Sequence, residues 1–220
     1  PTVPDPAEPG AALEIVRRFG LERKMPESVM AHLEKRAGRS KPDFVQTTEN
    51  ILVGSNRISL DAAEGAAAHR GYKTVILSEW LDGDVAAAAA AFHDAARAAP
   101  AGEKTAILSG GETSVEVTGS GKGGRNQEMA LRFALLCEES RLPVEWVFLS
   151  GGTDGRDGPT DAAGGITDPY TAGTLKATGK PAEAYLADND AYHALKEADG
   201  LVMTGATGTN VADLQVLLLG

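Results

Sequence analysis

The sequence has few of the residues that mark several common classes of protein. Cys137 is the one cysteine among 220 residues, so no disulfide can form within the chain and a reducing compartment is favoured. Aromatic residues make up only 5%, so the core must consist mostly of aliphatic side chains. No apolar run reaches the length of a membrane span, and no signal-peptide pattern opens the chain. The sequence therefore predicts a cytoplasmic protein with no membrane partner.

Positive charge is also scarce. Lysine and arginine number 21 against 31 acidic residues, and a net charge of −10 argues against a nucleic-acid partner. The four histidines lie far apart in the chain, which is not the spacing of zinc ligands. No G-x-S-x-G motif or Ser-His-Asp order is present, so acyl transfer has no support. A phosphorylated small substrate stays compatible, because single loops of an acidic protein can be electropositive.

What the sequence does contain is an alternation of apolar strands and amphipathic helices, which is typical of an α/β fold with parallel βαβ units. At 220 residues the chain can form one large domain or two small ones. Helices are predicted at 11–20, 27–36, 55–69, 84–99, 124–138, 171–178, 181–186 and 190–196. Strands are predicted at 47–54, 74–78, 106–109, 113–117, 145–150, 201–203 and 214–219, with the last two closing the sheet.

Three glycine-rich polar loops follow or precede these strands. The first lies within the stretch Lys104–Glu128, between a predicted strand and a predicted helix, and the others are Ser150–Gly165 and Thr204–Asp213. Loops that leave neighbouring strands of an α/β sheet at the same end lie close together. We therefore expect all three loops to meet at one edge of the sheet, and this convergence is the central structural prediction.

The first loop contains G-x-G-x-x-G, from Gly119 to Gly124. A dinucleotide fingerprint is one interpretation, but the preceding stretch alternates like a half-exposed strand, and the acidic residues about 20 positions on fall at a helix end. The other interpretation is general: a glycine turn before a helix lets backbone N–H groups approach an anion, with Lys122 and Arg125 beside it. A third is that the glycines only form a sharp turn.

The second loop crowds Asp154, Asp157 and Asp161 into eight residues. Carboxylates at this density repel one another unless a cation lies among them, and Mg²⁺ is held in proteins by one or two carboxylates together with substrate phosphates. The alternative is that aspartate and glycine are simply favoured in turns.

Four stretches, GGETSVEV, GKGGRNQE, GGTDGRDGPTDAAG and TGATGTNVADL, together resemble the glycerate 2-kinase family. The resemblance covers roughly Lys104–Leu219 and corresponds to the C-terminal domain of the family, called MOFRL. It implies a compact α/β domain with a mixed sheet at residues 101–220. Residues 1–100 resemble the end of a larger, Rossmann-like first domain. Members of this family are about twice as long, and the chain opens at Pro1 with no initiating methionine, so we expect a fragment of a longer protein.

The resemblance implies an ATP-dependent phosphorylation of D-glycerate to 2-phosphoglycerate with Mg²⁺, in a cleft between two domains, and it allows a homo-oligomer. By position in the motifs it implies Arg125, Asp154, Asp157 and Asp161 as catalytic residues, and Asp154 and Asp161 as metal ligands. The substrate- or phosphate-binding residues that it implies are Asn56, Glu112, Gly121, Lys122, Gly123, Gly124, Asn126, Glu128, Thr160, Thr207, Thr209, Asn210 and Asp213.

Two other functions stay open from the sequence. One is an NAD(P)H-dependent hydroxypyruvate reductase, a name that some relatives have carried, with the G-x-G-x-x-G motif as its support. The other is a non-catalytic ligand-binding module, which applies if the chain is complete and half of a two-domain site is missing.

Overall fold

The computed structural model describes residues 7–40 and 49–220. The chain divides into two compact units, Pro1–Val53 and Gly54–Gly220. The first contains α1 (Ala11–Arg18) and α2 (Glu27–Ala37), both close to the predicted ranges. α1 buries Leu13 and Val16. It is followed by Gly20 with a φ of +61°, the left-handed conformation expected of a glycine at this position.

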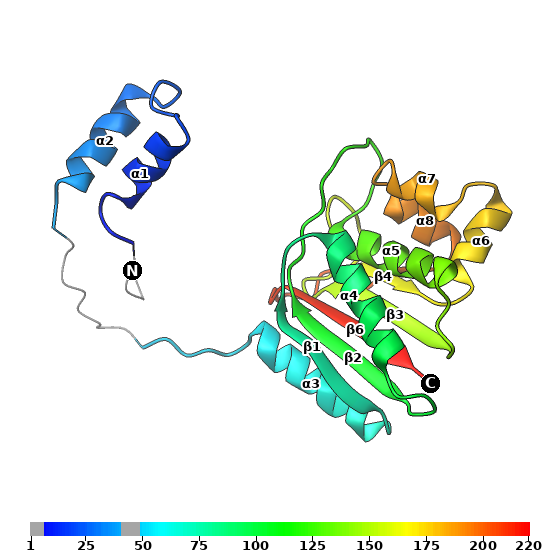
Figure 1. Ribbon diagram of the computed structural model, residues 1–220. Coiled ribbons are helices and arrows are strands. Elements are labelled where there is room, and N and C mark those ends of the chain that lie inside the picture. Colours follow the sequence, from blue (N-terminus) through cyan, green and yellow to red (C-terminus); the bar gives the residue numbers. More distant parts are fainter. Residues whose placement is uncertain (1–6, 41–48) are drawn as a thin grey trace. The chain divides into compact units, whose positions relative to one another are not determined.

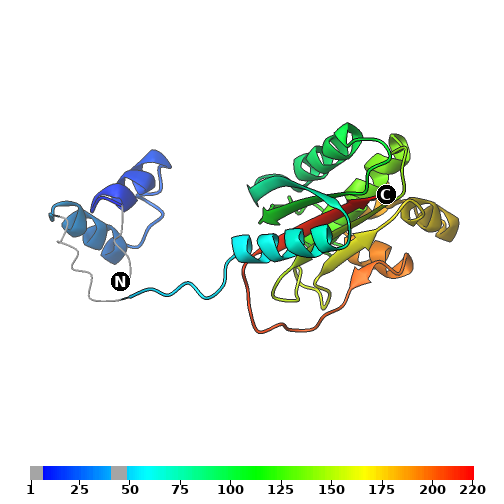
Figure 2. The same ribbon diagram turned by 90° about the horizontal axis from the view of Figure 1, so that it is seen from below.

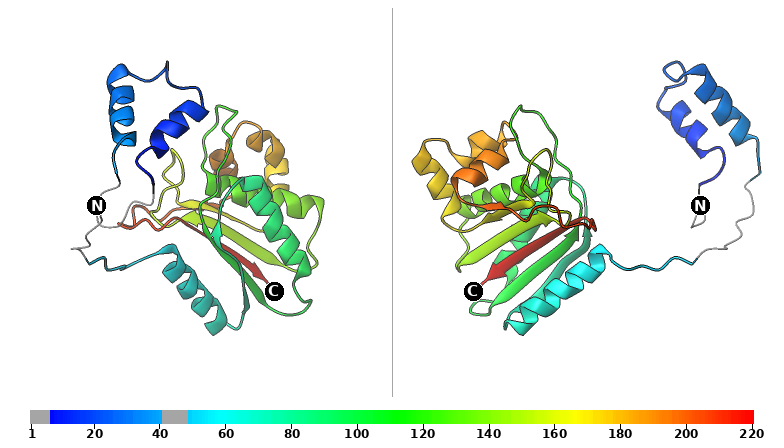
Figure 3. Two further views of the ribbon diagram at one scale, coloured as in Figure 1. Left: turned by 60° about the vertical axis from the view of Figure 1, so that its left-hand side comes forward. Right: turned by 180° about the vertical axis from the view of Figure 1, so that it is seen from behind.

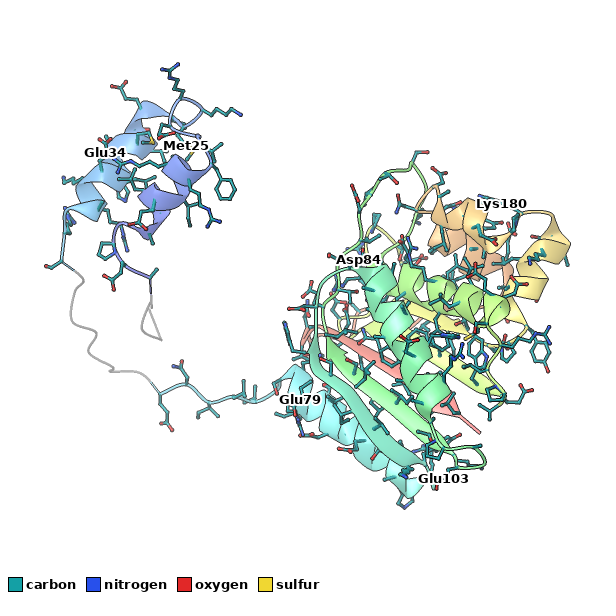
Figure 4. The ribbon with its side chains drawn as sticks, viewed as in Figure 1. Met25, Glu34, Glu79, Asp84, Glu103 and Lys180 are labelled. Atoms are coloured by element: carbon teal, nitrogen blue, oxygen red, sulfur yellow. The ribbon has the colours of Figure 1, made fainter. Side chains whose placement is uncertain are left out.

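The second unit contains the sheet and the three glycine-rich loops. Its elements in chain order are α3 (Asn56–His69), β1 (Lys73–Leu81), α4 (Val85–Ala98), β2 (Thr105–Gly111), α5 (Arg125–Glu139), β3 (Trp146–Gly152), β4 (Gly164–Thr167), α6 (Thr171–Thr178), α7 (Ala182–Leu186), α8 (Ala191–Glu197), β5 (Leu201–Val202) and β6 (Asp213–Leu219). Side chains start two of the helices: Ser55 accepts the Ile58 N–H before α3, and Asp84 accepts two N–H groups of α4 (Figure 4). In the described part of the chain, no helix has the length and apolar character that a bilayer span requires.

The six strands form one mixed sheet in the order β1-β2-β6-β3-β4-β5 (Figure 1). β1 and β2 are parallel and joined through α4, which confirms a βαβ unit. β6 is antiparallel to both β2 and β3 and lies between them. The sequence placed this strand at the closing edge of the sheet. It lies in the interior because alternate residues of β6 face the two helical layers. The apolar side chains on both faces of this strand are therefore buried only if helices pack against both faces.

Helices cover the two faces of the sheet (Figure 2). On one face, α4 and α5 enclose a core that includes Phe92, Phe133 and Phe148, whose rings lie 4.5 to 5.1 Å apart between neighbours. On the other face, α3 packs Leu60 against Leu108 and its neighbours. Helices α6, α7 and α8 pack on α5 through a second cluster of buried side chains. This packing brings the corner between α7 and α8 next to the start of α5.

Two predicted strands do not form. Residues 113–117 contain one isolated bridge, at Ser114, because β1 has already ended at Leu81 and supplies no continuous partner. In 47–54 the described residues 49–54 have no regular structure, and Val53 is 91% exposed, while 47 and 48 lie outside the described residues. One strand was missed: β4 is short and begins with Gly164 and Gly165, which carry little strand signal.

The compact units divide at Val53 and Gly54, whereas the sequence placed a domain boundary near residue 100. β1 and α4 lie before residue 100, yet β1 pairs along its length with β2 and α4 contributes to the same core as α5. The assignment of residues 1–100 to a larger domain of a longer protein stays a prediction.

Candidate functional site

The three glycine-rich loops meet at one end of the sheet, as predicted (Figure 3). β2 and β3 end at this edge, at Gly111 and Gly152. β6 starts there, since it runs antiparallel to both, and Asp213 pairs with both glycines. The convergence therefore follows from the antiparallel placement of β6 and not from three parallel strand ends.

The loop after β3 is tied to the loop before β6 by hydrogen bonds. Thr153 donates its N–H and its hydroxyl to Ala212 O at 3.0 and 2.7 Å, and Thr207 Oγ1 donates to Thr153 O at 2.6 Å. Asn210 Nδ2 lies 3.4 Å from Asp154 Oδ2. Ala212 has a φ of +66°, a strained value for a residue with a side chain. The turn into β6 is thus held in a costly conformation, directly before Asp213.

Arg125 is the first residue of α5 and stands between the loops. Its Nε lies 2.6 Å from Asp213 Oδ2 and its Nη2 lies 2.9 Å from Asp213 Oδ1, while Nη2 also lies 3.2 Å from Glu112 Oε1. The hydrogen bonds to Asp213 raise the pKa of Arg125, so the guanidinium is always charged. The family resemblance implied that Arg125 is a catalytic residue. In the structure the Nε–Nη2 edge is bound to Asp213, and Nη1 is the nitrogen with no partner among the described residues.

Asp157, which was expected to act on the substrate or the metal, instead caps α5 from the neighbouring loop. It is 1% exposed. Its Oδ1 accepts the N–H and Nδ2 of Asn126, both at 3.2 Å, and its Oδ2 accepts the N–H and Nε2 of Gln127 at 2.9 and 3.0 Å. Burial raises the pKa of Asp157, and the hydrogen bonds from these N–H groups offset part of the rise. Gly124, the cap residue of α5, has no side chain, so Asp157 supplies the missing acceptor.

A buried polar network continues beneath the first turn of α5. Ser150 Oγ donates to Asn126 Oδ1 at 2.6 Å, and Gln215 Nε2 lies 3.5 Å from Ser150 Oγ. Gln127 Nε2 also donates to Thr160 Oγ1 at 2.9 Å. Sequence reasoning missed Ser150, Gln127 and Gln215. The available signal was a polar residue within or next to an apolar strand, which must find a buried partner.

The backbone N–H groups of the first loop have a simple distribution. Those of residues 118–122 donate to residues 188–190, at the corner between α7 and α8, and those of Asn126 and Gln127 donate to Asp157. Among the described residues, the N–H groups of Gly123, Gly124 and Arg125 have no partner. Two of the amides that were predicted to bind an anion, those of Gly121 and Lys122, are therefore already bound to residues 188–190.

The glycines of the G-x-G-x-x-G motif serve this internal packing. A Cβ atom on Gly119 or Gly121 would overlap Asp188, and one on Gly124 would overlap the Asp157 carboxylate. Each glycine thus lets another part of the chain pack closely against the loop backbone. The N–H groups of Gly119 and Gly121 also already donate hydrogen bonds to Asn189 and Asp188. The pattern is explained without a dinucleotide.

Lys122 and Asp161 meet at the rim of the site through Tyr192 of α8. Lys122 Nζ lies 4.2 Å from the centre of the Tyr192 ring, and the Tyr192 hydroxyl donates to Asp161 Oδ1 at 2.7 Å. This hydrogen bond lowers the pKa of Asp161. Tyr192 was not among the predicted site residues.

Asp154 is the loop carboxylate that best suits a metal ion. A Cβ atom on Gly152 would lie 3.1 Å from Asp154 Oδ1 and 3.5 Å from Asp213 Oδ1, so both carboxylates flank this glycine. Asp154 is half-buried and accepts only the Arg156 N–H at 3.0 Å and the long contact from Asn210. No group of three or more His, Cys, Asp or Glu side chains able to hold a metal occurs within residues 7–40 and 49–220. Mg²⁺ needs fewer, because water and phosphate complete its shell.

The other predicted residues divide by burial. Asn56 is 7% exposed and donates from Nδ2 to Val211 O and Asp213 O, so it holds the start of β6. Glu128 is 3% exposed and accepts Arg132 and Asn189. Asn126 and Thr160 are buried in the network described above. The residues that stay on the accessible side are Glu112, Lys122, Thr207, Thr209 and Asn210.

Comparison with known proteins shows the family to which the chain belongs. The MOFRL family pattern matches residues 105–213. The chain is 40% identical to the D-glycerate 2-kinase of Thermotoga maritima, over 100% of this chain and 52% of that protein. It is 34% identical to the glycerate kinase of Macaca fascicularis, over 100% of this chain and 67% of that protein. The chain belongs to the glycerate 2-kinase family.

Solved structures agree with this membership. The crystal structure of glycerate kinase from Thermotoga maritima superimposes with a TM-score of 0.83 and 37% identity, covering 99% of this chain and 51% of that chain. A protein from Pyrococcus horikoshii OT3 superimposes with a TM-score of 0.75 and 34% identity, again over 99% of this chain and 51% of that chain. This chain therefore spans about half the length of the first relatives that it matches, while nearly all of this chain is covered by the match.

Proposed function

We propose that the protein carrying this chain phosphorylates D-glycerate at the 2-hydroxyl, using ATP and Mg²⁺, to give 2-phosphoglycerate and ADP. The observation that carries the proposal is the convergence of three loops around Arg125, with three unpaired amides and an accessible carboxylate, in a chain similar throughout to a D-glycerate 2-kinase. Phosphoryl transfer requires charge neutralisation and positioning more than covalent participation by protein. The groups at this edge of the sheet can provide both.

This chain would be the C-terminal part of the enzyme. Residues 101–220 would form the MOFRL domain, and residues 1–100 would end a larger Rossmann-like domain that completes a cleft. The support is the length of the relatives, about twice that of this chain. The loops at 110–124, 153–163 and 203–212 would form one wall of that cleft.

Arg125 and the adjacent amides would bind anionic oxygens. The charged Nη1 group can donate to the glycerate carboxylate or to the transferring phosphoryl group. The N–H groups of Gly123, Gly124 and Arg125 come at the start of α5, where the helix dipole favours negative charge. Lys122 adds a cation at the rim. Asp213 and Glu112 would orient the guanidinium rather than contact the substrate.

Asp154 would hold Mg²⁺, with water and phosphate oxygens completing the coordination shell. When bound, the metal neutralises negative charge on the phosphate oxygens. Asp161, the other predicted metal ligand, keeps Oδ2 for a ligand, while its Oδ1 accepts the Tyr192 hydroxyl. Asp157 would act at a distance, because its carboxylate is buried against α5.

An assay of the full-length protein tests the proposal. D-glycerate with ATP–Mg²⁺ should release ADP, and hydroxypyruvate with NADH should show no NADH oxidation. NADH oxidation without ADP release would overturn the kinase in favour of the reductase.

Calorimetry of this chain alone with ATP–Mg²⁺ addresses the division of the site. Weak or absent nucleotide binding is expected if the other half carries most of the nucleotide contacts. Tight binding by this chain would contradict that division.

A further inference from the structure

The corner between α7 and α8, Asp188-Asn189-Asp190, organises the glycine loop although it lies outside the four sequence stretches on which the family resemblance was based. Asn189 has a φ of +53°, a left-handed conformation that asparagine tolerates better than most residues. The conformation turns its side chain toward the loop, where it makes four hydrogen bonds. A corner residue in this backbone state with every side-chain hydrogen-bonding group in use serves a purpose beyond linking two short helices.

The Asn189 side chain bonds the loop from both of its polar atoms. Its Oδ1 accepts the N–H groups of Thr118 and Gly119, both at 2.8 Å. Its Nδ2 donates to Glu116 O at 3.1 Å and to Glu128 Oε2 at 3.2 Å. One side chain thus joins the loop to the first turn of α5.

The residues on either side of Asn189 continue the same pattern. Asp188 accepts the Ser120 N–H on Oδ1 at 2.7 Å and the Gly121 N–H on its backbone oxygen at 2.8 Å. Asp190 Oδ1 accepts the Lys122 N–H at 3.0 Å. Five consecutive loop amides are bound by three consecutive corner residues, and the unpaired amides begin at the next residue.

Glu128 connects this arrangement to α5. Its carboxylate is 3% exposed, with Oε1 bonded to Arg132 at 2.9 and 2.8 Å and Oε2 bonded to Asn189. The corner therefore determines how the loop enters the helix, and so the direction of the N–H groups at residues 123–125. A ligand bound at those amides would depend on a residue that it does not touch.

We propose that Asn189 is a positioning residue for the phosphoryl-transfer site, holding the loop so that the amides of Gly123, Gly124 and Arg125 face the anion. The inference rests on the proposed function. Without the Asn189 side chain, the loop populates the competent arrangement for only a fraction of the time. Apparent affinity then falls by that fraction, so the KM for ATP rises. Loss of alignment also lowers kcat.

The test uses the full-length protein with Asn189→Gly, which accepts the positive φ and removes only the side chain. The matched control is Asp199→Gly. Asp199 also has a positive φ, +55°, but it lies after α8, is exposed and has no side-chain bond to the loop. In Asn189→Gly, amide exchange at residues 118–122 should accelerate, kcat/KM should fall by about tenfold or more, and the KM for ATP should rise. The control should match the wild type in all three.

A rescue pair separates positioning from general destabilisation, which reduces the amount of folded enzyme without changing KM. Asn189→Asp keeps the acceptor but places a carboxylate oxygen 3.2 Å from Glu128 Oε2. Adding Glu128→Gln replaces that repulsion with a hydrogen bond of reversed polarity. The double variant should recover kcat/KM relative to Asn189→Asp, with a coupling beyond additivity.

The outcomes distinguish failure of the positioning role of Asn189 from failure of the proposed kinase function. Faster exchange with unchanged kinetic constants in Asn189→Gly would overturn the inference, as would unchanged exchange or a lowered kcat with an unchanged KM for ATP. If the wild-type protein releases no ADP from D-glycerate and ATP–Mg²⁺, the proposed function fails first and the inference with it.

Discussion

The two ends of the sheet differ in how their surfaces are built. At the end where β2 and β3 finish, loops are joined by hydrogen bonds around Arg125, and three backbone N–H groups have no partner in the part of the chain that the structure describes. At the opposite end there is open space: a hollow of about 630 Å³ is lined by Cys137, Trp146, Tyr170 and their neighbours. Further hollows of about 480 and 290 Å³ adjoin it around Tyr170.

The difference shows that the largest hollows and the convergent charged groups lie at different ends of the sheet. Burial raises the pKa of Cys137 to about 12, so its thiol is inert near neutrality. Glu138, which lines the same hollow, is paired with Lys176 at 2.9 Å. The loop end instead concentrates charged groups that face each other at hydrogen-bond distance. Function is expected where polar groups converge, and the following experiments test that assignment.

The largest effect is expected for Arg125→Ala in the full-length protein. Removing the guanidinium takes away a preorganised cation at the reacting groups, and kcat/KM should fall by about 10² or more. Arg125→Lys keeps the charge but not the fork that Asp213 orients, so it should recover only part of the loss. Near-normal kinetics of Arg125→Ala would remove this residue from the mechanism and weaken the assignment of the loop end.

Asp157→Ala should lower stability. The change leaves the buried N–H groups of Asn126 and Gln127 without an acceptor, which costs about 1–3 kcal/mol in the free energy of unfolding. Urea denaturation measures this loss. Asp157→Asn, which keeps one acceptor oxygen, should cost less. Equal stability of all three proteins would show that the cap contributes nothing.

The corner at residues 188–190 should respond to acid. Burial alone would raise the pKa of Asp190, but hydrogen bonds from His193 and the Lys122 N–H outweigh it and lower the pKa below 3.8. The stability contributed by ionised Asp190 is therefore present above its ordinary pKa and is lost as the pH falls through the lowered value. Asp190→Asn should reduce the acid-dependent part of the unfolding free energy below about pH 4, by less than about 1 kcal/mol. An unaltered pH dependence would contradict this.

The smallest effect is expected at the opposite end. Tyr170→Ala removes a side chain that is 69% exposed and lines the hollows, and kcat/KM should change by less than about twofold. A large drop in kcat/KM, with folding intact by circular dichroism, would show that the hollow belongs to the active site and would reverse the comparison.

Local pattern was enough to predict most elements. The alanine-rich stretch that becomes α4 begins at Asp84 and ends before Pro100, so its caps and its breaker are in the sequence. The apolar runs of β1, β2, β3 and β6 were equally clear. The alternation at 113–117 misled because a strand also needs a continuous partner, and the described residues provide only the isolated bridge at Ser114. β4 escaped because two glycines hide its pattern.

The structure shows where the predicted site residues lie, whereas their roles stay predictions. Arg125 and Asp154 lie at the loop edge as expected, whereas Asp157, Asn126, Glu128 and Thr160 are buried supports. The sequence pattern of an aspartate in a glycine-rich loop is the same whether its carboxylate faces a ligand or caps a helix. Burial alone separates the two, and burial depends on chain far away in sequence.

The sequence by itself determined the α/β class, the positions of most helices and strands, the family and the set of polar loops. The tertiary structure decided that β6 lies between β2 and β3, that Asp213 occupies the Arg125 fork, and that residues 188–190 bind the glycine loop. Local structure depends on side chains within a few residues of each other. The contacts Arg125–Asp213, Asn126–Asp157 and Glu128–Asn189 join residues 31 to 88 positions apart, and only the packing of the whole unit brings them together.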